Sequence, residues 1–331
     1  MFCKSIFRSI LLVIIGNAMC YIARATISND HRHQQVSNKA ANILAYEIGA
    51  KASFNPSREN YRPVTDCMFV TSDSGPFSYV SQSDNDEVCG IYFLTDPDRV
   101  VELYFQSYDV PCERHGLLAV IDGWELNGEV FPSEADHMLP VKERVNEFCG
   151  KNGWRRKTFS SSQNVALLQY KIPSSEKGFV VFAKYPKNPR PCNILSVSTT
   201  DPFTIRNYGR RINCTLIAVY PGVVRVIALG VGGVSQSVAR TTTETGTLRK
   251  CGTRSPRDLV QIGGSRGLDT TKLDVIDTIC GIDSKPDIRE LVAYDVTSVR
   301  LISSGDYDNS VTVAISQIVN DDLLLDSASG F

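Results

Sequence analysis

The sequence lacks an excess of charge of either sign. Its 331 residues include 35 lysines and arginines against 36 aspartates and glutamates, and the formal net charge is −1. Proteins that bind nucleic acid or anionic membranes through their overall field are rich in basic residues. The charge balance therefore excludes a global basic field, and we expect neither nucleic acid nor membrane as a partner.

Long apolar segments are also lacking after the first 25 residues. No later segment reaches the 18 or so apolar residues that a membrane-spanning helix needs. The C-terminal run Asp321–Asp326 is short and acidic. The sequence therefore predicts no membrane anchor in this part of the chain.

The N-terminus itself has the pattern of a secretory signal peptide. Two basic residues flank the start of the apolar run Ile10–Ile15, and Ala23 and Ala25 stand at positions −3 and −1 of a cleavage site. A membrane anchor is the alternative, but it needs about 20 apolar residues, and Gly16 interrupts the run. We therefore predict a secreted, extracellular protein. Cleavage after Ala25 would take the formal charge from −1 to −4, because three basic residues are removed.

Histidine is scarce, and the common catalytic motifs are missing. The chain has four histidines, no His-Glu-x-x-His zinc helix, no Gly-x-Ser-x-Gly nucleophile turn, no Walker loop and no dinucleotide-binding glycine fingerprint. His115 and His137 have no nucleophile beside them in sequence, and partners distant in sequence stay open. The acidic run Asp84–Glu87 lacks the ordered ligand register of a calcium loop. We expect a protein that is not an enzyme and that holds no cofactor or metal.

Cysteine, in contrast, is abundant, and its spacing repeats. Eight of the ten cysteines follow the signal peptide, and 21 residues separate both Cys67 from Cys89 and Cys192 from Cys214. Eight cysteines allow 105 pairings, but the repeated spacing indicates a duplicated four-cysteine unit and favours pairing between neighbours. Zinc binding is the alternative, and it needs closer spacings such as Cys-x2-Cys. We expect four disulfides: Cys67–Cys89, Cys112–Cys149, Cys192–Cys214 and Cys251–Cys280.

Short apolar runs, rich in β-branched and aromatic residues, lie between the cysteines. Examples are Gly90–Leu94, Leu117–Ile121 and Val223–Leu229, and turns rich in Gly, Pro, Asn and Asp separate them. Short strands at regular intervals are typical of antiparallel β-sandwiches. Three prolines in Tyr185–Pro191 indicate a linker. We predict an all-β chain divided into a signal peptide (1–25), a leader (26–60), a first sandwich (61–186), a second sandwich (187–320) and a tail (321–331).

Two local features complete this description. In Lys39–Ile48, residues Ala40, Ile43 and Leu44 fall on one helical face, which predicts a short N-terminal helical segment. Asn213-Cys-Thr is the one glycosylation sequon with a permitted middle residue, so we expect a glycan on Asn213.

The first unit carries a series of short motifs, at Cys112, Leu117–Gly123, Phe148–Gly150, Ser161–Leu168 and Gly178–Phe182. In this series the unit resembles a CUB module. The resemblance implies that the two predicted sandwiches are tandem CUB-like modules. Gly116 stands where CUB modules usually carry an acidic residue, which argues against the calcium site of many CUB modules here.

The chain also holds six longer blocks: Val120–Ser133, Asp136–Pro140, Glu147–Cys149, Ser161–Ala166, Pro191–Ser196 and Arg300–Gly305. In these blocks the chain is similar to the corticotropin-releasing factor-binding protein family, and the similarity runs from about residue 61 to residue 317. The family comprises secreted glycoproteins that bind corticotropin-releasing-factor-like peptide hormones and limit their access to receptors. The resemblance implies that this chain sequesters such a peptide, of the diuretic-hormone type.

An amphipathic peptide that becomes helical on burial needs an apolar groove or an exposed sheet edge with a few charged anchors. We place the peptide contacts where the chain enters the first sandwich, at Tyr61, Arg62, Met68 and Phe69. Met68 and Phe69 as ordinary core residues are the alternative. A second hypothesis for the whole protein is an extracellular adhesion or co-receptor module of the CUB type that binds another protein.

Overall fold

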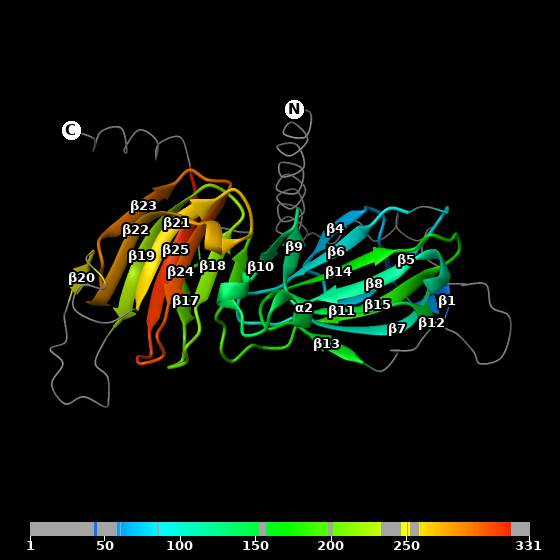
Figure 1. The fold of residues 1–331 in the computed structure, drawn as a ribbon, viewed down its shortest axis with the longest axis horizontal. Helices are drawn as coiled ribbons and strands as arrows, with labels where there is room; N and C mark the ends of the chain where they lie inside the picture. Colours follow the sequence, from blue (N-terminus) through cyan, green and yellow to red (C-terminus); the bar gives the residue numbers. More distant parts are fainter. Residues whose placement is uncertain are drawn as a thin grey trace, which may run out of the picture.

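The computed structural model describes residues 43–44, 58–59, 61–84, 86–151, 157–197, 201–232, 246–249, 251 and 258–318. These residues form two β-sandwiches that lie side by side along the long axis of the molecule (Figure 1). The predicted all-β fold of two tandem sandwiches is confirmed. No helix in the described ranges is long and apolar enough to cross a membrane.

The first sandwich consists of a five-stranded and a six-stranded sheet. The five-stranded sheet has the order β11-β8-β14-β6-β4, with β4 (Met68–Thr71), β6 (Cys89–Leu94), β8 (Leu117–Ile121), β11 (Val145–Phe148) and β14 (Val165–Lys171). The six-stranded sheet contains β3 (Arg62–Pro63), β5 (Gly75–Val80), β7 (Glu102–Val110), β12 (Gly150–Lys151), β13 (Thr158–Ser160) and β15 (Gly178–Lys184). The pairs β3–β5 and β4–β6 are parallel, and the other pairs in these two sheets are antiparallel.

The core of this sandwich is aromatic. Phe77, Phe93, Phe105 and Phe179 are fully buried between the two sheets. The rings of Phe77 and Phe93 meet edge to face, 5.5 Å apart, which is a favourable arrangement for aromatic pairs. Burial of each such side chain stabilises the fold by about 1.5–3 kcal/mol.

The second sandwich is built from ten strands. They are β16 (Ile194–Ser196), β17 (Phe203–Arg206), β18 (Cys214–Ala218), β19 (Gly222–Val231), β20 (Gly246–Leu248), β21 (Leu259–Ser265), β22 (Asp274–Asp283), β23 (Ile288–Val292), β24 (Val296–Ile302) and β25 (Ser310–Gln317). Strand β22 pairs with β21 through its first part and with β19 and β20 through its last residues. It therefore connects the two layers of this sandwich, whose core is mainly aliphatic.

Short elements complete the structure. Strand β1 (Ile43–Leu44) pairs with β2 (Arg58–Glu59), so the two described residues of the predicted helical segment are extended, and the rest of Lys39–Ile48 lies outside the described residues. A hairpin of β9 (Trp124–Leu126) and β10 (Glu129–Phe131) follows β8, and the one-turn helix α2 (Val141–Arg144) precedes β11. Three-residue 3-10 helices begin at Cys112, Glu134 and Thr270.

A third apolar cluster joins the two sandwiches. Residues on the outer face of the five-stranded sheet, among them Tyr92 and Leu167, pack there with Trp124 of the hairpin and with Leu195 and Ile217 of the second sandwich. The indole ring of Trp124 stands edge-on to Tyr92 at 5.3 Å, and its Nε1 donates to the Phe93 carbonyl at 3.0 Å. The hairpin β9–β10 therefore lies at the junction of the sandwiches, as Figure 1 shows.

The structure joins the cysteines in the four pairs expected from their spacing. The bonds are Cys67–Cys89, Cys112–Cys149, Cys192–Cys214 and Cys251–Cys280. Cys67 directly precedes β4 and Cys89 begins β6, so the first bond ties these neighbouring strands together. In the second sandwich, Cys192–Cys214 does the same for the start of β16 and of β18.

Candidate functional site

The four residues expected to contact a peptide lie on two neighbouring segments but do not form one surface. Tyr61 is 4% exposed, and its hydroxyl donates to Gln106 Oε1 at 3.0 Å. Phe69 is half-buried against the aromatic core and meets Phe77 edge-on at 6.2 Å. Both side chains therefore have packing partners inside the first sandwich.

The other two expected residues are accessible. The guanidinium group of Arg62 donates to the Ser74 carbonyl at 2.9 Å, lies 3.4 Å from the Asp73 carboxylate and stands 5.6 Å from the centre of the Phe77 ring. Met68 is 38% exposed on β4. Of the four, Arg62 and Met68 are the side chains that a ligand can reach, since Tyr61 and the inner side of Phe69 are packed.

Strand β4 is an edge strand. Among the described strands it pairs only with β6, in parallel register, and the amide of Gly90 donates to the Cys67 carbonyl at 2.7 Å. In a strand, alternate residues direct their backbone N–H and C=O groups to the same side. The groups of Met68 and Val70 therefore face away from β6. Such an edge offers backbone groups to an added strand.

A cleft lies beyond the end of β4, where the two sandwiches meet. Its volume is about 510 Å³. The first sandwich contributes Ser72, Ser74 and the segment after β6, and the second contributes the end of β16 and Phe203 of β17. Apolar side chains from both sandwiches, including Leu94, Leu195 and Phe203, alternate in the lining with polar ones.

The cleft is held in shape by hydrogen bonds between segments distant in sequence. The amide nitrogen of Asn164 donates to the carbonyls of Thr95 and Leu195, at 2.9 and 2.8 Å, and its oxygen accepts from the Leu195 amide at 2.9 Å. Arg99 donates to the Tyr185 carbonyl at 2.7 Å. Burial raises the pKa of the Tyr185 phenol, whose hydroxyl donates to the Asp73 carbonyl. The lining is therefore largely fixed before any ligand arrives.

The sequence did not predict this cleft. Its key contact joins Asn164 and Leu195, which stand in two of the blocks that carry the family resemblance, Ser161–Ala166 and Pro191–Ser196. The blocks were the available signal, but a bond between a side chain and a distant backbone leaves no periodic pattern in a sequence.

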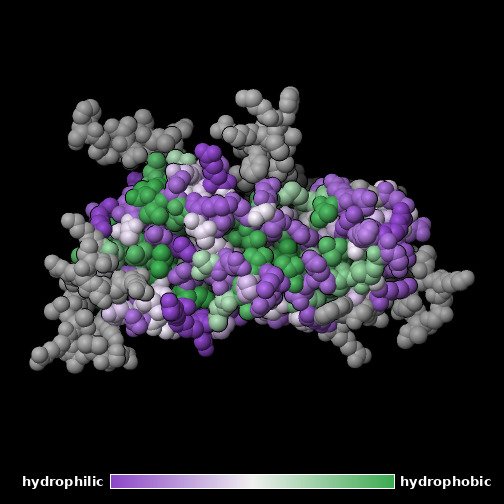
Figure 2. Space-filling model, viewed as in Figure 1, coloured by the Kyte–Doolittle hydropathy of each residue, from purple (hydrophilic) through white to green (hydrophobic). Residues whose placement is uncertain are grey.

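On the face drawn in Figure 2, apolar residues form patches that hydrophilic residues separate. The edge of β4 and the cleft that follows it form one continuous candidate site, which we call the β4 site.

His137 lies against a serine and an aspartate, yet the arrangement differs from a nucleophilic triad. Its Nε2 is 2.8 Å from Ser162 Oγ and 3.3 Å from Asp122 Oδ2, while the Leu139 amide donates to its Nδ1 at 2.9 Å. In a triad the acid holds the imidazole nitrogen that is not bonded to the nucleophile. Here serine and acid share one nitrogen, so the group anchors the turn at Asp122 and does not prepare a nucleophile.

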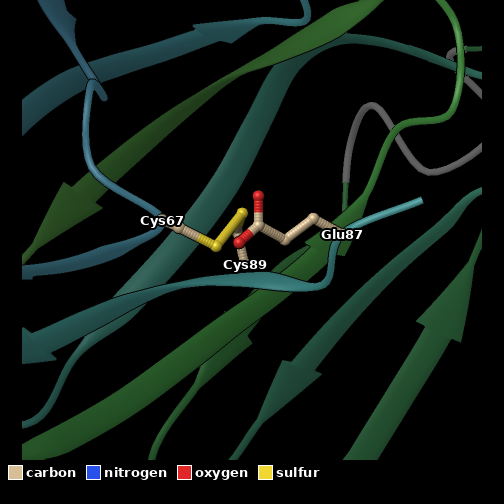
Figure 3. Close-up of side chains that lie close together, drawn as sticks. All are labelled: Cys67, Glu87 and Cys89. Carbon is tan, nitrogen blue, oxygen red and sulfur yellow. A yellow bond between two sulfur atoms is a disulfide. The ribbon is translucent and has the colours of Figure 1, made fainter. Parts of the chain in front are cut away.

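A second cluster of ligand-type atoms is explained by a disulfide. The sulfurs of Cys67 and Cys89 lie beside the Glu87 carboxylate, within 4.8 Å, but they are bonded to each other (Figure 3). Bonded sulfurs are not thiolates, and metal binding by cysteine needs the thiolate. Nearby, Asp84 pairs with Arg114 at 3.0 Å, and the Ser175 amide and Arg114 lower the pKa of its carboxyl. The acidic run thus uses its charge in surface pairs.

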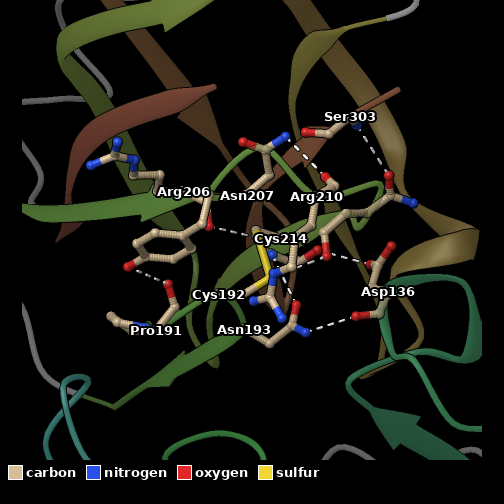
Figure 4. Close-up of a disulfide and its surroundings, with 12 residues drawn as sticks. Asp136, Pro191, Cys192, Asn193, Arg206, Asn207, Arg210, Cys214 and Ser303 are labelled. Carbon is tan, nitrogen blue, oxygen red and sulfur yellow. Dashed lines mark hydrogen bonds between the residues drawn. A yellow bond between two sulfur atoms is a disulfide. The ribbon is translucent and has the colours of Figure 1, made fainter. Parts of the chain in front are cut away.

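The expected glycosylation site, Asn213, lies at the junction and directly precedes Cys214 of the Cys192–Cys214 disulfide. Asn213 is half-buried, and its Nδ2 donates to the Ala135 carbonyl at 3.0 Å. Beside this disulfide, Asn193 donates to the Asp136 carbonyl at 2.7 Å, as Figure 4 shows. The segment around Asp136 therefore reaches the second sandwich at the same place.

Comparison with known proteins gives matches along both sandwiches. Residues 59–187 match the corticotropin-releasing factor binding protein N-terminal domain, and residues 194–324 match the C-terminal domain of the same family. The human corticotropin-releasing factor-binding protein is 30% identical over 259 residues, covering 78% of this chain and 77% of that protein. The rat protein of the same name is 29% identical over 300 residues, covering 90% and 89%.

Solved structures that align with the chain include proteins with paired CUB domains. The CUB1-EGF-CUB2 domains of rat MASP-1 align with a TM-score of 0.26 at 11% identity, covering 74% of this chain and 99% of that one. The full extracellular region of zebrafish Gpr126/Adgrg6 aligns with a TM-score of 0.27 at 12% identity, covering 78% and 38%.

Proposed function

Because the chain belongs to the corticotropin-releasing factor-binding protein family, we propose that it captures a corticotropin-releasing-factor-like peptide hormone and limits the hormone's access to its receptor. The observation that carries the proposal is the match of both sandwiches to the family's two domains. Members of this family are binding proteins and not enzymes, and the position of Asp122 on the same nitrogen of His137 as Ser162 agrees with that. The match to a peptide-binding family does not favour the alternative of an adhesion module.

The protein acts outside the cell. The signal-peptide pattern of residues 1–25 supports export, and so does the pairing of eight cysteines, because disulfides form and persist in oxidising compartments. The glycan on Asn213 belongs to the same route. Secretion places the binder in the medium through which peptide hormones travel.

The hormone binds at the β4 site. The edge of β4 supplies backbone hydrogen bonds through Met68 and Val70, and the cleft beyond it receives apolar side chains between Leu94 and Phe203. Arg62 and Met68 contact the peptide, while Tyr61 and Phe69 hold the two segments against the core. A pre-formed cleft lowers the ordering cost that binding imposes on the protein, so more of the interaction energy remains as affinity.

Titration of the purified secreted protein with a fluorescently labelled corticotropin-releasing-factor-like peptide tests the function. We expect saturable binding, competed by the unlabelled peptide and unaffected by a scrambled peptide of the same composition. A peptide that shows no saturable signal up to micromolar protein would contradict the proposal.

A matched pair of variants tests the place of binding. Met68→Pro removes one N–H from the open edge, whereas Met68→Ala removes only the exposed side chain and keeps the N–H. We expect the proline variant to lose at least tenfold more affinity than the alanine variant, with both unfolding at similar temperatures. Equal losses would place the peptide elsewhere than along the edge.

A second pair tests the cleft. Phe203→Ala removes an apolar wall of the cleft, and Ile282→Ala removes an exposed apolar side chain that does not line it. About tenfold weaker binding for Phe203→Ala corresponds to about 1.4 kcal/mol. If Ile282→Ala weakens binding as much, the cleft has no special role.

A further inference from the structure

A cationic side chain is buried in the first sandwich with most of its donors unused. Arg144 ends helix α2 and is 2% exposed. Its Nη1 donates to the Pro132 carbonyl at 2.8 Å, while Nε and Nη2 are inaccessible to solvent and have no hydrogen-bond partner among the described residues. Buried polar groups are normally hydrogen-bonded, so two unused donors on one guanidinium group call for an explanation.

No carboxylate in the described part of the chain forms a salt bridge with Arg144. The acidic groups that act on its charge are Asp122 and Glu134. Asp122 Oδ1 accepts from the Ser162 amide at 2.7 Å and from Gln163 at 2.8 Å, and its Oδ2 faces His137. Glu134 accepts from the Val141 amide. Both acids already hold other donors, and burial lowers the pKa of Arg144 despite their charges.

Arg144 lines a cavity of about 190 Å³ next to β11 and β13. These two strands and α2 lie close together at one edge of the first sandwich (Figure 1). Val101 and Phe159 form part of an apolar wall, and the exposed residues Thr158 and Ser160 mark the mouth. The space is sufficient for several water-sized groups.

A second cation lines the same cavity. Lys157 Nζ donates to Asn146 Oδ1 at 2.9 Å and stands 4.9 Å from the centre of the Phe159 ring. Arg144 and Lys157 together outnumber Asp122, the acid in the lining, so the walls carry a net positive charge. The chemistry of the lining therefore suits an anion with an apolar stem.

We propose that this cavity binds a carboxylate, with the Nε and Nη2 of Arg144 donating to its two oxygens. These two nitrogens lie along one edge of the planar guanidinium group and form the fork that binds both oxygens of a carboxylate at once. Because both are inaccessible to solvent without a ligand, binding includes a shift of the Arg144 side chain toward the cavity that it lines. The apolar walls receive the carbon stem, and Lys157 adds charge at the mouth. The carboxylate comes either from a small free acid or from an acidic side chain of the bound peptide.

Propionate is the probe for the first source, because it reproduces the end of a glutamate side chain. Propionamide is its neutral control at matched ionic strength. For the full secreted chain we expect propionate, and not propionamide, to raise the thermal unfolding midpoint in a saturable way and to shift the nuclear magnetic resonance of the Arg144 Nε–H. A propionate effect no larger than that of propionamide would overturn the proposal.

Substitutions separate binding from packing. Arg144→Met should abolish the propionate effect, and Arg144→Lys, which keeps the charge but loses the fork, should weaken it at least tenfold. Arg114→Met, at an exposed site outside the cavity, should leave it unchanged. If Arg144→Met does not fold, Arg144→Lys and Lys157→Gln still decide the matter, because propionate effects equal to those of the unchanged protein in both would refute the site.

The second source rests on the proposed function and is tested apart from it. Peptides with single Glu→Gln or Asp→Asn changes are titrated against the unchanged protein and against Arg144→Lys. If neutralising one acidic position of the peptide weakens its binding to the unchanged protein but not to Arg144→Lys, the carboxylate comes from that position of the peptide. Peptide variants that all behave alike, together with a propionate effect, assign the site to a free acid. A hormone that does not bind at all contradicts the proposed function and leaves the propionate result to stand alone.

Discussion

Asp136 in the first sandwich and Arg300 in the second form a salt bridge across the junction, although their sequence separation is 164. Asp136 Oδ1 lies 2.6 Å from Nη2, and Arg300 Nε lies 2.9 and 3.1 Å from the two carboxylate oxygens. The hydroxyls of Thr215 and Thr270 donate to the same carboxylate at 2.8 and 2.6 Å. One side chain that is 1% exposed thus binds three groups of the other sandwich.

Asp136→Ala should lower the free energy of unfolding by about 3–5 kcal/mol, because it leaves the largely buried guanidinium group of Arg300 and the buried Thr215 hydroxyl without their acceptor. Urea denaturation followed by tryptophan fluorescence measures the loss. The exposed pair Arg206–Asp308 supplies the control, and Asp308→Ala should cost about 1 kcal/mol or less. Similar losses for the two variants would show that the junction does not depend on the buried pair.

Removal of the Cys192–Cys214 disulfide should destabilise the protein by about 3 kcal/mol, since the bond closes a loop with a sequence separation of 22 residues. The double variant Cys192→Ala/Cys214→Ala measures this by thermal unfolding. Peptide mapping of the unreduced protein checks the pairing itself. A peptide that links either of these cysteines to a third one would refute both the pairing and the estimate.

The carboxyl group of Glu290 predicts a pH dependence. Its burial and the neighbouring Asp277 charge raise its pKa, although Arg249 lies 3.3 Å away. The folded state therefore holds this proton more tightly than the unfolded state does. The stability linked to that proton is present below the ordinary pKa and is lost as pH rises through the raised one.

Glu290→Gln should accordingly raise the unfolding temperature near neutral pH and change it less near pH 4. Asp283 is the opposite case, because bonds from Lys285 and Thr247 lower its pKa. Asp283→Asn should reduce stability near neutral pH and have less effect in acid. Unfolding temperatures measured from pH 4 to 7 test both, and parallel curves for Glu290→Gln and the unchanged protein would contradict the first.

Enzymatic deglycosylation should reduce the mass of the secreted protein by one N-linked glycan. Asn213→Gln should remove that shift. Thr215→Ser should keep it, because serine preserves both the sequon and a hydroxyl for Asp136. Mass spectrometry before and after the deglycosylating enzyme distinguishes these results. A glycan that survives in Asn213→Gln would place the modification at another residue.

The sequence predicted the β-sandwiches because turn residues and short β-branched runs repeat along the chain. Two uninterrupted runs in the sequence, Cys214–Ala218 and Cys89–Leu94, are explained only by the structure. All five residues of Cys214–Ala218 are buried, and so are five of the six in Cys89–Leu94. A strand with one face in solvent alternates between apolar and polar residues, so continuous apolar runs indicate burial of both faces. These two runs indicate that both faces of the strands are buried, but a run does not show which part of the protein covers the second face.

The site was less predictable than the fold. The peptide contacts are predicted where the chain enters the first sandwich, from Tyr61 to Phe69, and the structure puts β4 of this segment at a sheet edge. Which side chains face outward depends on register, and a shift of one residue exchanges the two faces of a strand. Tyr61 was therefore expected at a surface where it is in fact buried.

Because of the apolar cluster at the junction, a reagent for hormone capture needs both sandwiches. A first sandwich produced alone would present Tyr92, Trp124 and Leu167 to water, and a second one alone would present Leu195 and Ile217. Contiguous apolar exposure promotes aggregation. In a single sandwich, these apolar residues would therefore have to be replaced by polar ones. In the intact protein, each sandwich buries the apolar residues of the other.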